Sequence, residues 1–299
     1  MHRAPLVALL LAALVPSLTA GAQQDGRWAP IRRVFGQGET EDGYFRVNLP
    51  RTDFHVRIGG DALDPGFEFT SYVGFVPASE RDRVLAMGEV VLLDTEVPAV
   101  LAAAHAQGVQ VTAVHNHLLG ETPRVVYVHV MAEGAAESVA RELRAVYAAS
   151  ATPLAPTPEE PARGDWSAID AVLGKHAEAH GRVAEYEFPR HEKLVVHGTA
   201  VKSSGAIESA SEVVFQQLGG ARVACTGELY LLASEVRPVT RALDARGLHV
   251  TALHTHMLDD GPPHFWVHWY AAGDGATLAR GVAAALALTH GATRSESSN

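Results

Sequence analysis

The sequence predicts an α+β protein built from two tandem ferredoxin-like repeats, each with a βαββα core, that pack as an internal pseudo-dimer. The first observation behind this prediction is a repeat: residues 87–134 match residues 226–273 without a gap, and 21 of 48 positions are identical. The second is the composition, since 47% hydrophobic and 19% charged residues are typical of globular domains with their own cores. The third is the alternation of strand-like and helix-like segments within each copy.

Each copy is expected to contain the same elements in the same order. An opening helix precedes two strands, FRVNLP and DFHVRI in the first copy, which match AEYEFP and EKLVVHG in the second. The first copy continues with a strand at 85–93, a helix at 96–106, a hairpin of strands at 109–118 and 124–132, and a helix at 136–149. This order is typical of a ferredoxin-like unit, in which helices cover one face of an antiparallel sheet. The free faces of the two sheets are expected to pack together around an enclosed space, with side-by-side packing as the alternative.

The chain divides into five predicted segments. The N-terminus is typical of an export signal, because a short basic start and an apolar run precede the small residues Ala20, Gly21 and Ala22. The segment between the copies contains four prolines, which are incompatible with a helix or a central strand. The division is a signal peptide at 1–22, repeat one at 23–150, a proline-rich linker at 151–164, repeat two at 165–291 and a disordered tail at 292–299. We therefore expect a periplasmic or secreted protein.

Charge and composition exclude several classes of function. The formal net charge of −10 argues against a nucleic-acid-binding role, because phosphate binding requires clustered Lys and Arg. After the export signal, no segment is apolar and long enough to predict a membrane span. The single cysteine, Cys225, excludes an internal disulfide and lies in an apolar, strand-like stretch, which predicts a buried thiol.

The placement of the histidines is the strongest functional signal. His115 and His117 lie two residues apart on a predicted strand, so both are expected to project from one face. A turn centred near Glu121 places His129, on the return strand, opposite Ala113 and diagonal to His115. The second copy repeats the pattern as His254, His256 and His268.

A carboxylate is expected to complete each set of three imidazoles. Glu89 and its counterpart Glu228 lie on the first core strand, which in a ferredoxin-like sheet neighbours the second hairpin strand. Three His and one Glu are a suitable ligand set for a divalent metal, Zn²⁺ or a redox metal such as Fe²⁺, Mn²⁺ or Cu²⁺. The alternative is a buried polar network without a metal. If only one copy is active, the first is the expected one.

Other paired residues predict mainly structural roles. Glu96 and Glu235 begin equivalent helices, where a carboxylate stabilises the N-terminus. Arg51 with Asp53, and Arg190 with Glu192, are expected to form ion pairs along a strand, with gripping an anionic ligand as the minority interpretation. Tyr127 and Trp266 occupy equivalent sites between the histidines and are expected either to pack in the core or to stack on a ligand.

The strings MGEVVLL, VTAVHNHLLGETPR and VTALHTHML, with PR-T-D and DW upstream, resemble the LppY/LpqO family of exported bacterial proteins over residues 27–290. The resemblance implies an exported protein of a domain family of unknown function, and so it implies no reaction. The second copy departs from the family's HNH-ML-x-E-x-PR string at Thr255, Asp259 and Pro263. Some members resemble lipoproteins, but this signal region contains no cysteine for lipidation.

These observations leave two classes of function open. The leading hypothesis is an exported protein with a His-rich metal or ligand site on the sheet face, acting as a metal-dependent enzyme on a small polar ligand. The alternative is a non-catalytic periplasmic module, either ligand-binding or envelope-interacting, in which the histidines are structural.

Overall fold

The computed structural model describes residues 19–290 except 81, 159 and 193, and side chains from residue 26 onward. Most of the predicted signal peptide, and the predicted tail at 292–299, lie outside the described residues. The first half contains α1 (Thr19–Phe35), β1 (Glu39–Glu41), β2 (Tyr44–Pro50), β3 (Val56–Ile58), β4 (Asp61–Leu63), β5 (Thr70–Pro77), β6 (Arg83–Leu93), η1 (Asp94–Glu96), α2 (Val97–Gln107), β7 (Gln110–His115), β8 (Glu121–Thr122), β9 (Val125–Ala135) and α3 (Ala136–Tyr147). The second half contains α4 (Ser167–Leu173), β10 (Glu178–His180), β11 (Val183–Phe188), β12 (Leu194–Val196), β13 (Thr199–Val201), η2 (Gly205–Ile207), β14 (Ser211–Gly219), β15 (Arg222–Leu232), α5 (Ala233–Asp244), β16 (His249–His254), β17 (Asp260–Gly261), β18 (His264–Asp274) and α6 (Gly275–Leu286).

The protein is α+β with two repeated halves, as the sequence predicts. Each half has a six-stranded antiparallel sheet, in the order β1-β2-β5-β6-β9-β7 in the first and β10-β11-β14-β15-β18-β16 in the second. Within this sheet, β6, α2, β7, β9 and α3 follow the predicted βαββα order, with β9 between β6 and β7. The sheet also contains a long strand that the prediction lacks, β5 in the first half and β14 in the second. The predicted strand DFHVRI belongs instead to a small sheet of β4, β3 and β8.

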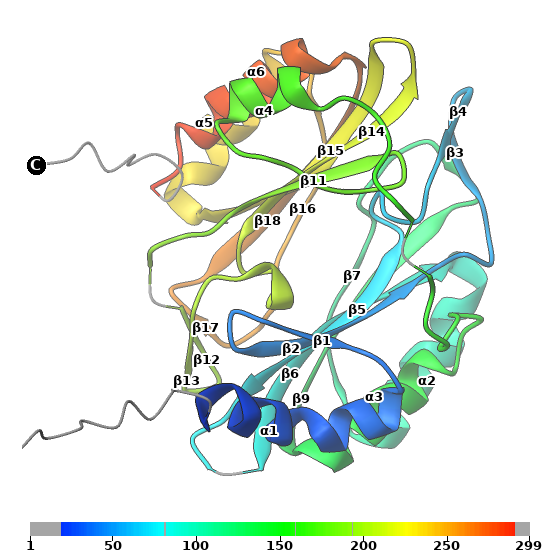
Figure 1. Ribbon diagram of the computed structural model, residues 1–299, viewed down its shortest axis with the longest axis vertical. Coiled ribbons are helices and arrows are strands. Elements are labelled where there is room, and N and C mark those ends of the chain that lie inside the picture. The colour runs from blue at the N-terminus through cyan, green and yellow to red at the C-terminus, as the bar shows by residue number, and fades with distance from the viewer. Residues whose placement is uncertain (1–18, 81, 159, 193, 291–299) are drawn as a thin grey trace, which may run out of the picture.

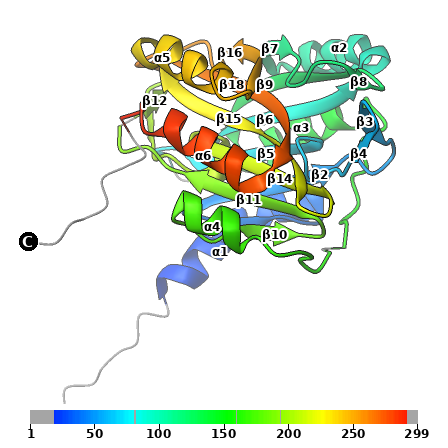
Figure 2. The same cartoon turned by 90° about the horizontal axis from the view of Figure 1, so that it is seen from above.

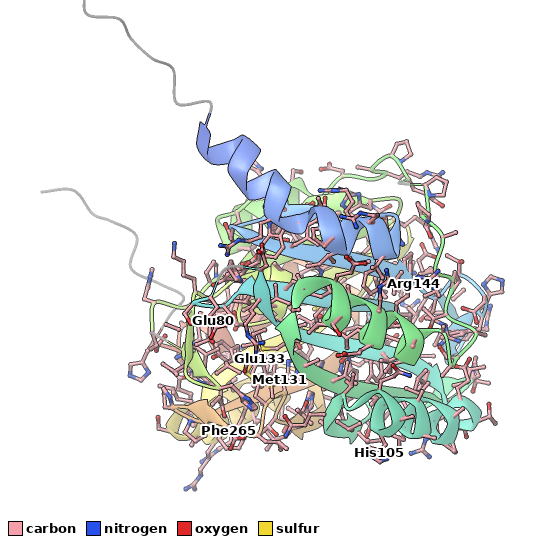
Figure 3. The ribbon with its side chains drawn as sticks, turned by 90° about the horizontal axis from the view of Figure 1, so that it is seen from below. Glu80, His105, Met131, Glu133, Arg144 and Phe265 are labelled. Carbon is pink, nitrogen blue, oxygen red and sulfur yellow. The ribbon has the colours of Figure 1, made fainter. Side chains whose placement is uncertain are left out.

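The two large sheets face each other, and the helices cover their outer faces (Figure 1). One apolar core lies under α1, α2 and α3, and a second lies under α4, α5 and α6. Figure 3 shows the three helices of the first half lying over their sheet. Two further clusters combine apolar side chains from both halves, so the inner faces of the sheets are also packed. The arrangement is therefore sheet to sheet and not side by side.

At one edge of the molecule, β7 and β16 lie beside each other (Figure 2). Equivalent threonines connect the two halves there. The Thr112 hydroxyl donates to the backbone carbonyl of His256, and the Thr251 hydroxyl donates to the backbone carbonyl of His117. Each bond fixes the backbone of a predicted ligand in the opposite half. The halves are therefore joined at the point where the histidine loops emerge from the sheets.

Buried ion pairs fix the start of the helix that follows the long core strand. Arg51 is fully buried and contacts Asp53 at 2.8 Å and Glu96 at 3.0 Å. Glu96 also accepts the Leu93 amide at 2.8 Å, which satisfies one of the free N–H groups at the helix start. Arg190 repeats the arrangement with two carboxylates in the second half. The predicted ion pairs and the predicted helix-start role of Glu96 are confirmed, but each ion pair lies just after a strand, β2 or β11, and not on it.

Within the part of the chain that the structure describes, no helix combines the length and the apolar character needed to cross a bilayer. Cys225 is fully buried, as predicted, and burial raises the pKa of its thiol to about 12.

Candidate metal centre

The two predicted histidine sets form one shared cluster between the sheets rather than two separate sites. Each ring of one half stacks on a ring of the other half, with centroid separations of 3.5 Å for His115 on His254, 3.8 Å for His117 on His268 and 3.8 Å for His129 on His256. The stacking pairs are related by the internal repeat, so the cluster lies on the pseudo-two-fold axis of the molecule. Neither half alone contains the whole site.

The strand register places the ligands much as the sequence indicates. Ala113 on β7 pairs with His129 on β9, which is the predicted register. Glu89 on β6 lies directly opposite His129, so the carboxylate and the imidazole project from neighbouring strands to the same face. One detail differs, because β7 ends at His115 and His117 lies beyond the strand. Its ring nevertheless joins the cluster, with its centroid 5.1 Å from that of His115.

Three donor atoms of the first half converge. Oε2 of Glu89 lies 3.1 Å from Nε2 of His117 and 3.1 Å from Nε2 of His129. All three residues are at most 3% exposed, and none of the three atoms has a partner with hydrogen-bond geometry among the described residues. For an ion bound about 2.1 Å from two donors at this spacing, the donor–ion–donor angle would be about 95°. The Glu89 carboxylate oxygen therefore lies within reach of both imidazole nitrogens.

His115 and His254 extend this donor set from the open side of the cluster. One nitrogen from each of His115, His117, His129 and His254 can be chosen so that all four lie within 4.8 Å of one another. Nε2 of His254 also lies 2.9 Å from Nε2 of His268. The four imidazoles come from both halves, and Glu89 lies beside two of them, His117 and His129.

Hydrogen bonds on the outer side of the rings orient them. Nδ1 of His117 is 2.7 Å from Oε2 of Glu68. Nδ1 of His115 lies 3.3 Å from the carbonyl of Asn116, and Nδ1 of His254 lies 3.4 Å from the carbonyl of Thr255. Carbonyl and carboxylate oxygens only accept, so we assign the proton to Nδ1 in these three rings. In the neutral form of each ring, Nε2 then carries the lone pair, and this is the form that binds a metal.

Glu68 contacts the histidine cluster, and the sequence prediction did not include it. It lies between β4 and β5, has a left-handed backbone with φ of 74°, and also approaches Nδ1 of His268 at 3.7 Å. Its counterpart Glu208 is left-handed as well, with φ of 48°. Glutamate in this conformation is uncommon and marks a position held by its surroundings. The available signal was the match of PGFE (65–68) to GAIE (205–208), which requires an offset one residue larger than that of the main repeat.

Charge interactions within the cluster are strong. Burial tends to raise the pKa of Glu89, but the imidazoles of His117 and His129 outweigh burial and lower this pKa well below its usual range. Burial tends to lower the pKa of His117, yet Glu89 and Glu68 raise it to about 10. Burial and the neighbouring rings lower the pKa of His254 to about 2. Without a metal, the site therefore contains an imidazolium that a bound cation would replace.

The second-half set is looser and has different neighbours. Oε2 of Glu228 lies 3.6 Å from Nε2 of His256 and 3.8 Å from Nε2 of His268. Glu228 and His256 form a separate group of potential ligands with Glu208. The two halves thus present unequal ligand sets, a compact one around Glu89 and an open, more acidic one around Glu228.

The two aromatic residues between the histidines pack against the rings. Tyr127 stacks on His117 with centroids 3.6 Å apart, and Trp266 stacks on His256 at 3.9 Å. Both are almost fully buried. This packing corresponds to the core alternative of the prediction, and the rings hold two of the imidazoles in position.

Comparison with known families fits this picture of a duplicated chain. Residues 29–149 and 167–288 each match the family described as Domain of Unknown Function (DUF1259). The chain belongs to this family. The two matches coincide with the two structural halves. Comparisons with curated proteins and with solved structures gave no match. Membership therefore supplies no reaction, and the resemblance to the LppY/LpqO family stays a prediction.

Proposed function

We propose that this protein is an exported metalloprotein that binds one divalent transition metal between its two halves. Glu89, His117 and His129 are the central ligands, and His115 and His254 complete the coordination. The observation that supports this proposal best is the convergence of three buried donor atoms at 3.1 Å without hydrogen-bond geometry. Buried polar atoms in native proteins nearly always have a partner, and a metal ion would supply one.

The donor geometry favours Fe²⁺ or Mn²⁺ over Zn²⁺. Structural zinc is usually four-coordinate and tetrahedral, with angles of about 109°. The angle of about 95° derived above suits a five- or six-coordinate ion. Two imidazoles and one carboxylate on one face are also the ligand set of non-haem iron(II) centres. His268 and Glu228 then belong to the surroundings of this ion.

The size of the site limits the molecules with which the ion would react. A small cavity beside the cluster has a volume of about 10 Å³, and His129 is the one proposed ligand that lines it. This is roughly the space for one water molecule. A molecule that reached the ion through this cavity would have to be water-sized or diatomic, such as dioxygen or superoxide, and smaller than the polar ligand expected from the sequence. Redox chemistry or metal storage then fits the site better than hydrolysis of an extended substrate.

We retain the ferredoxin-like description of each half within this proposal. The order β6-β9-β7, with α2 and α3 on one face, supports it. The strand next to β6 is β5, which precedes it in the chain. In this description, the shared inner face of two such units is what creates the metal site.

Metal analysis of the mature protein, purified without a His tag, tests the proposal. We expect Glu89→Gln and His129→Ala each to bind about one equivalent less of Fe²⁺ or Mn²⁺ than wild type. The control variant is His105→Ala, since His105 lies exposed on α2, away from the cluster (Figure 3). If His129→Ala fails to fold, the less buried His115→Gln replaces it.

The competing explanation is a metal-free network of stacked imidazoles, which the ring separations of 3.5–3.8 Å favour. That explanation predicts a wild-type protein with no bound metal and no change in thermal stability on adding Fe²⁺, Mn²⁺, Zn²⁺ or Cu²⁺. Such a result would refute the proposed function.

A further inference from the structure

We propose that Glu208, Glu228 and His256 form a second cation site, for a divalent ion that prefers carboxylate oxygens, beside the histidine-rich centre. One ligand atom from each of the three residues lies within 4.8 Å of the others. Its ligands differ from those of the first site, so the two proposals can fail separately.

The first argument is the absence of other partners for deeply buried polar atoms. Glu228 and His256 are each 5% exposed. Oε1 of Glu228 and both ring nitrogens of His256 have no hydrogen-bond partner among the residues that the structure describes. Leaving a buried polar atom unpaired costs about 1–3 kcal/mol, so three such atoms in one small group indicate a partner of another kind.

The second argument compares the equivalent pairs of the two halves. Glu68 and His117 are joined directly, with 2.7 Å between Oε2 and Nδ1. Their counterparts are Glu208 and His256, yet neither nitrogen of His256 has a hydrogen bond within the described part of the chain. The same two residue types on the same backbone framework have therefore separated in the second half. Glu228 is the third member of the group. The three side chains therefore surround a shared space instead of forming one hydrogen-bonded pair.

The third argument is charge. Beyond Glu208 and Glu228, the same inner face carries Glu212, which pairs across the strands with Glu228, and Glu185 lies near Glu212. The guanidinium of Arg46 contacts Glu208 at 3.4 Å. One guanidinium contacts this group of four carboxyl groups, and burying them together in ionised form would be costly. A divalent cation at Glu208 and Glu228 would add positive charge to this acidic region.

The fourth argument is space. His256 is the one member of the group that lines the cavity of about 10 Å³, together with Ile207, which precedes Glu208, and Met257. It is about the size of one water or one ion. Trp266 closes the other side, because it stacks on His256 at 3.9 Å and donates from Nε1 to the Glu208 carbonyl at 3.0 Å. Two carboxylates and one imidazole suit Mn²⁺, a metal that accepts oxygen ligands.

Mn²⁺ titration of the mature full-length protein, with bound ion measured by electron paramagnetic resonance and elemental analysis, tests this site. We expect two equivalents for wild type and one for both Glu228→Gln and Glu208→Gln. Glu133→Gln is the matched control, because Glu133 is a partly exposed carboxylate on β9, 41% exposed and paired with Arg83 (Figure 3). It should bind two equivalents.

The first site is removed separately with His115→Ala, which should bind one equivalent of Mn²⁺. The double variant His115→Ala/Glu228→Gln should bind none. Circular dichroism confirms that each variant is folded, and Glu208→Gln serves if Glu228→Gln is not. The second site is refuted if Glu228→Gln and Glu208→Gln bind as much Mn²⁺ as wild type, or if wild type binds one equivalent that depends only on His115. If the two glutamate variants lose bound Mn²⁺ while His115→Ala binds as much as wild type, the histidine-rich centre alone is refuted.

Discussion

Glu68→Gln is the most informative single change, because it leaves every proposed ligand of the first metal in place. Glu68 accepts from Nδ1 of His117 at 2.7 Å and so orients Nε2 toward Glu89 and His129. A carboxylate in this position also makes the imidazole a better donor. Glutamine keeps the shape of the side chain but lacks the charge. We expect metal affinity to fall by about ten- to a hundredfold, which is typical of such supporting residues.

The effect on stability follows from linkage. With free metal at about 100 times the wild-type Kd, binding stabilises the folded protein by about 2.7 kcal/mol. A Kd that is about tenfold larger reduces this stabilisation to about 1.4 kcal/mol, and one that is about a hundredfold larger reduces it to about 0.4 kcal/mol. At about 2 °C per kcal/mol for a chain of this size, the metal-induced rise in Tm should be about 5 °C in wild type and about 1–3 °C in Glu68→Gln.

The assay compares Tm with metal and with a chelator for each protein, so that any cost of the substitution to the metal-free fold cancels. Glu133→Gln is again the control and should keep the full increment. If the increment for Glu68→Gln equals that of wild type while the metal-free form is less stable, then Glu68 is only a structural partner of His117. The orientation argument would then be wrong.

Two further predictions concern parts of the fold that support the site. Gly74→Ala should destabilise the protein by about 3 kcal/mol in chemical denaturation, because a Cβ there would overlap the Ala206 carbonyl of the other half. Gly60→Ala is the control and should be neutral, since a Cβ at Gly60 would have no described atom within 4 Å. Glu235→Gln should change the pH dependence of stability. Burial tends to raise the pKa of Glu235, but Arg190 and the other hydrogen-bond donors around it lower this pKa from 4.5 to about 2. Its ionised form therefore contributes about 3 kcal/mol above pH 4.5, which is lost as the pH falls toward 2. Wild type and variant should differ by this amount at pH 7 and converge near pH 2 in urea unfolding, and parallel curves would contradict the assignment.

The sequence could predict the parts of the site that depend on local repeat and register. The repeat identifies equivalent histidines, and the hairpin pairing places His129 opposite Ala113, because a strand register is fixed once its turn is located. Glu89 follows from the same reasoning, since neighbouring strands bring their paired residues to one face. These inferences required no knowledge of how the two halves pack.

Other features could not be read from the sequence for physical reasons. The strand Thr70–Pro77 is buried on both faces, so it lacks the alternation that marks a half-exposed strand. Glu68 comes from a connection outside the main sheet and reaches the cluster only through tertiary packing. Its counterpart in the second half, Glu208, is displaced by one residue from the offset of the main repeat, and this displacement hides the match. The shared cluster depends on the face-to-face packing of two sheets, and sequence pattern left that open.

The position of the cluster on the pseudo-two-fold axis explains why the two halves could become unequal. In a symmetric dimer, both copies of Glu68 would have to contact His117 in the same way, so two identical sites would form across the axis. A single duplicated chain removes this requirement, because each half can change independently. One half now has a glutamate hydrogen-bonded to its histidine, and the other has Glu208 and His256 held apart. Residues on the axis cannot diverge so freely, since His115 and His254 stack on each other at 3.5 Å. Duplication followed by such divergence provides a physical route from one repeated ligand set to adjacent sites with different metal preferences.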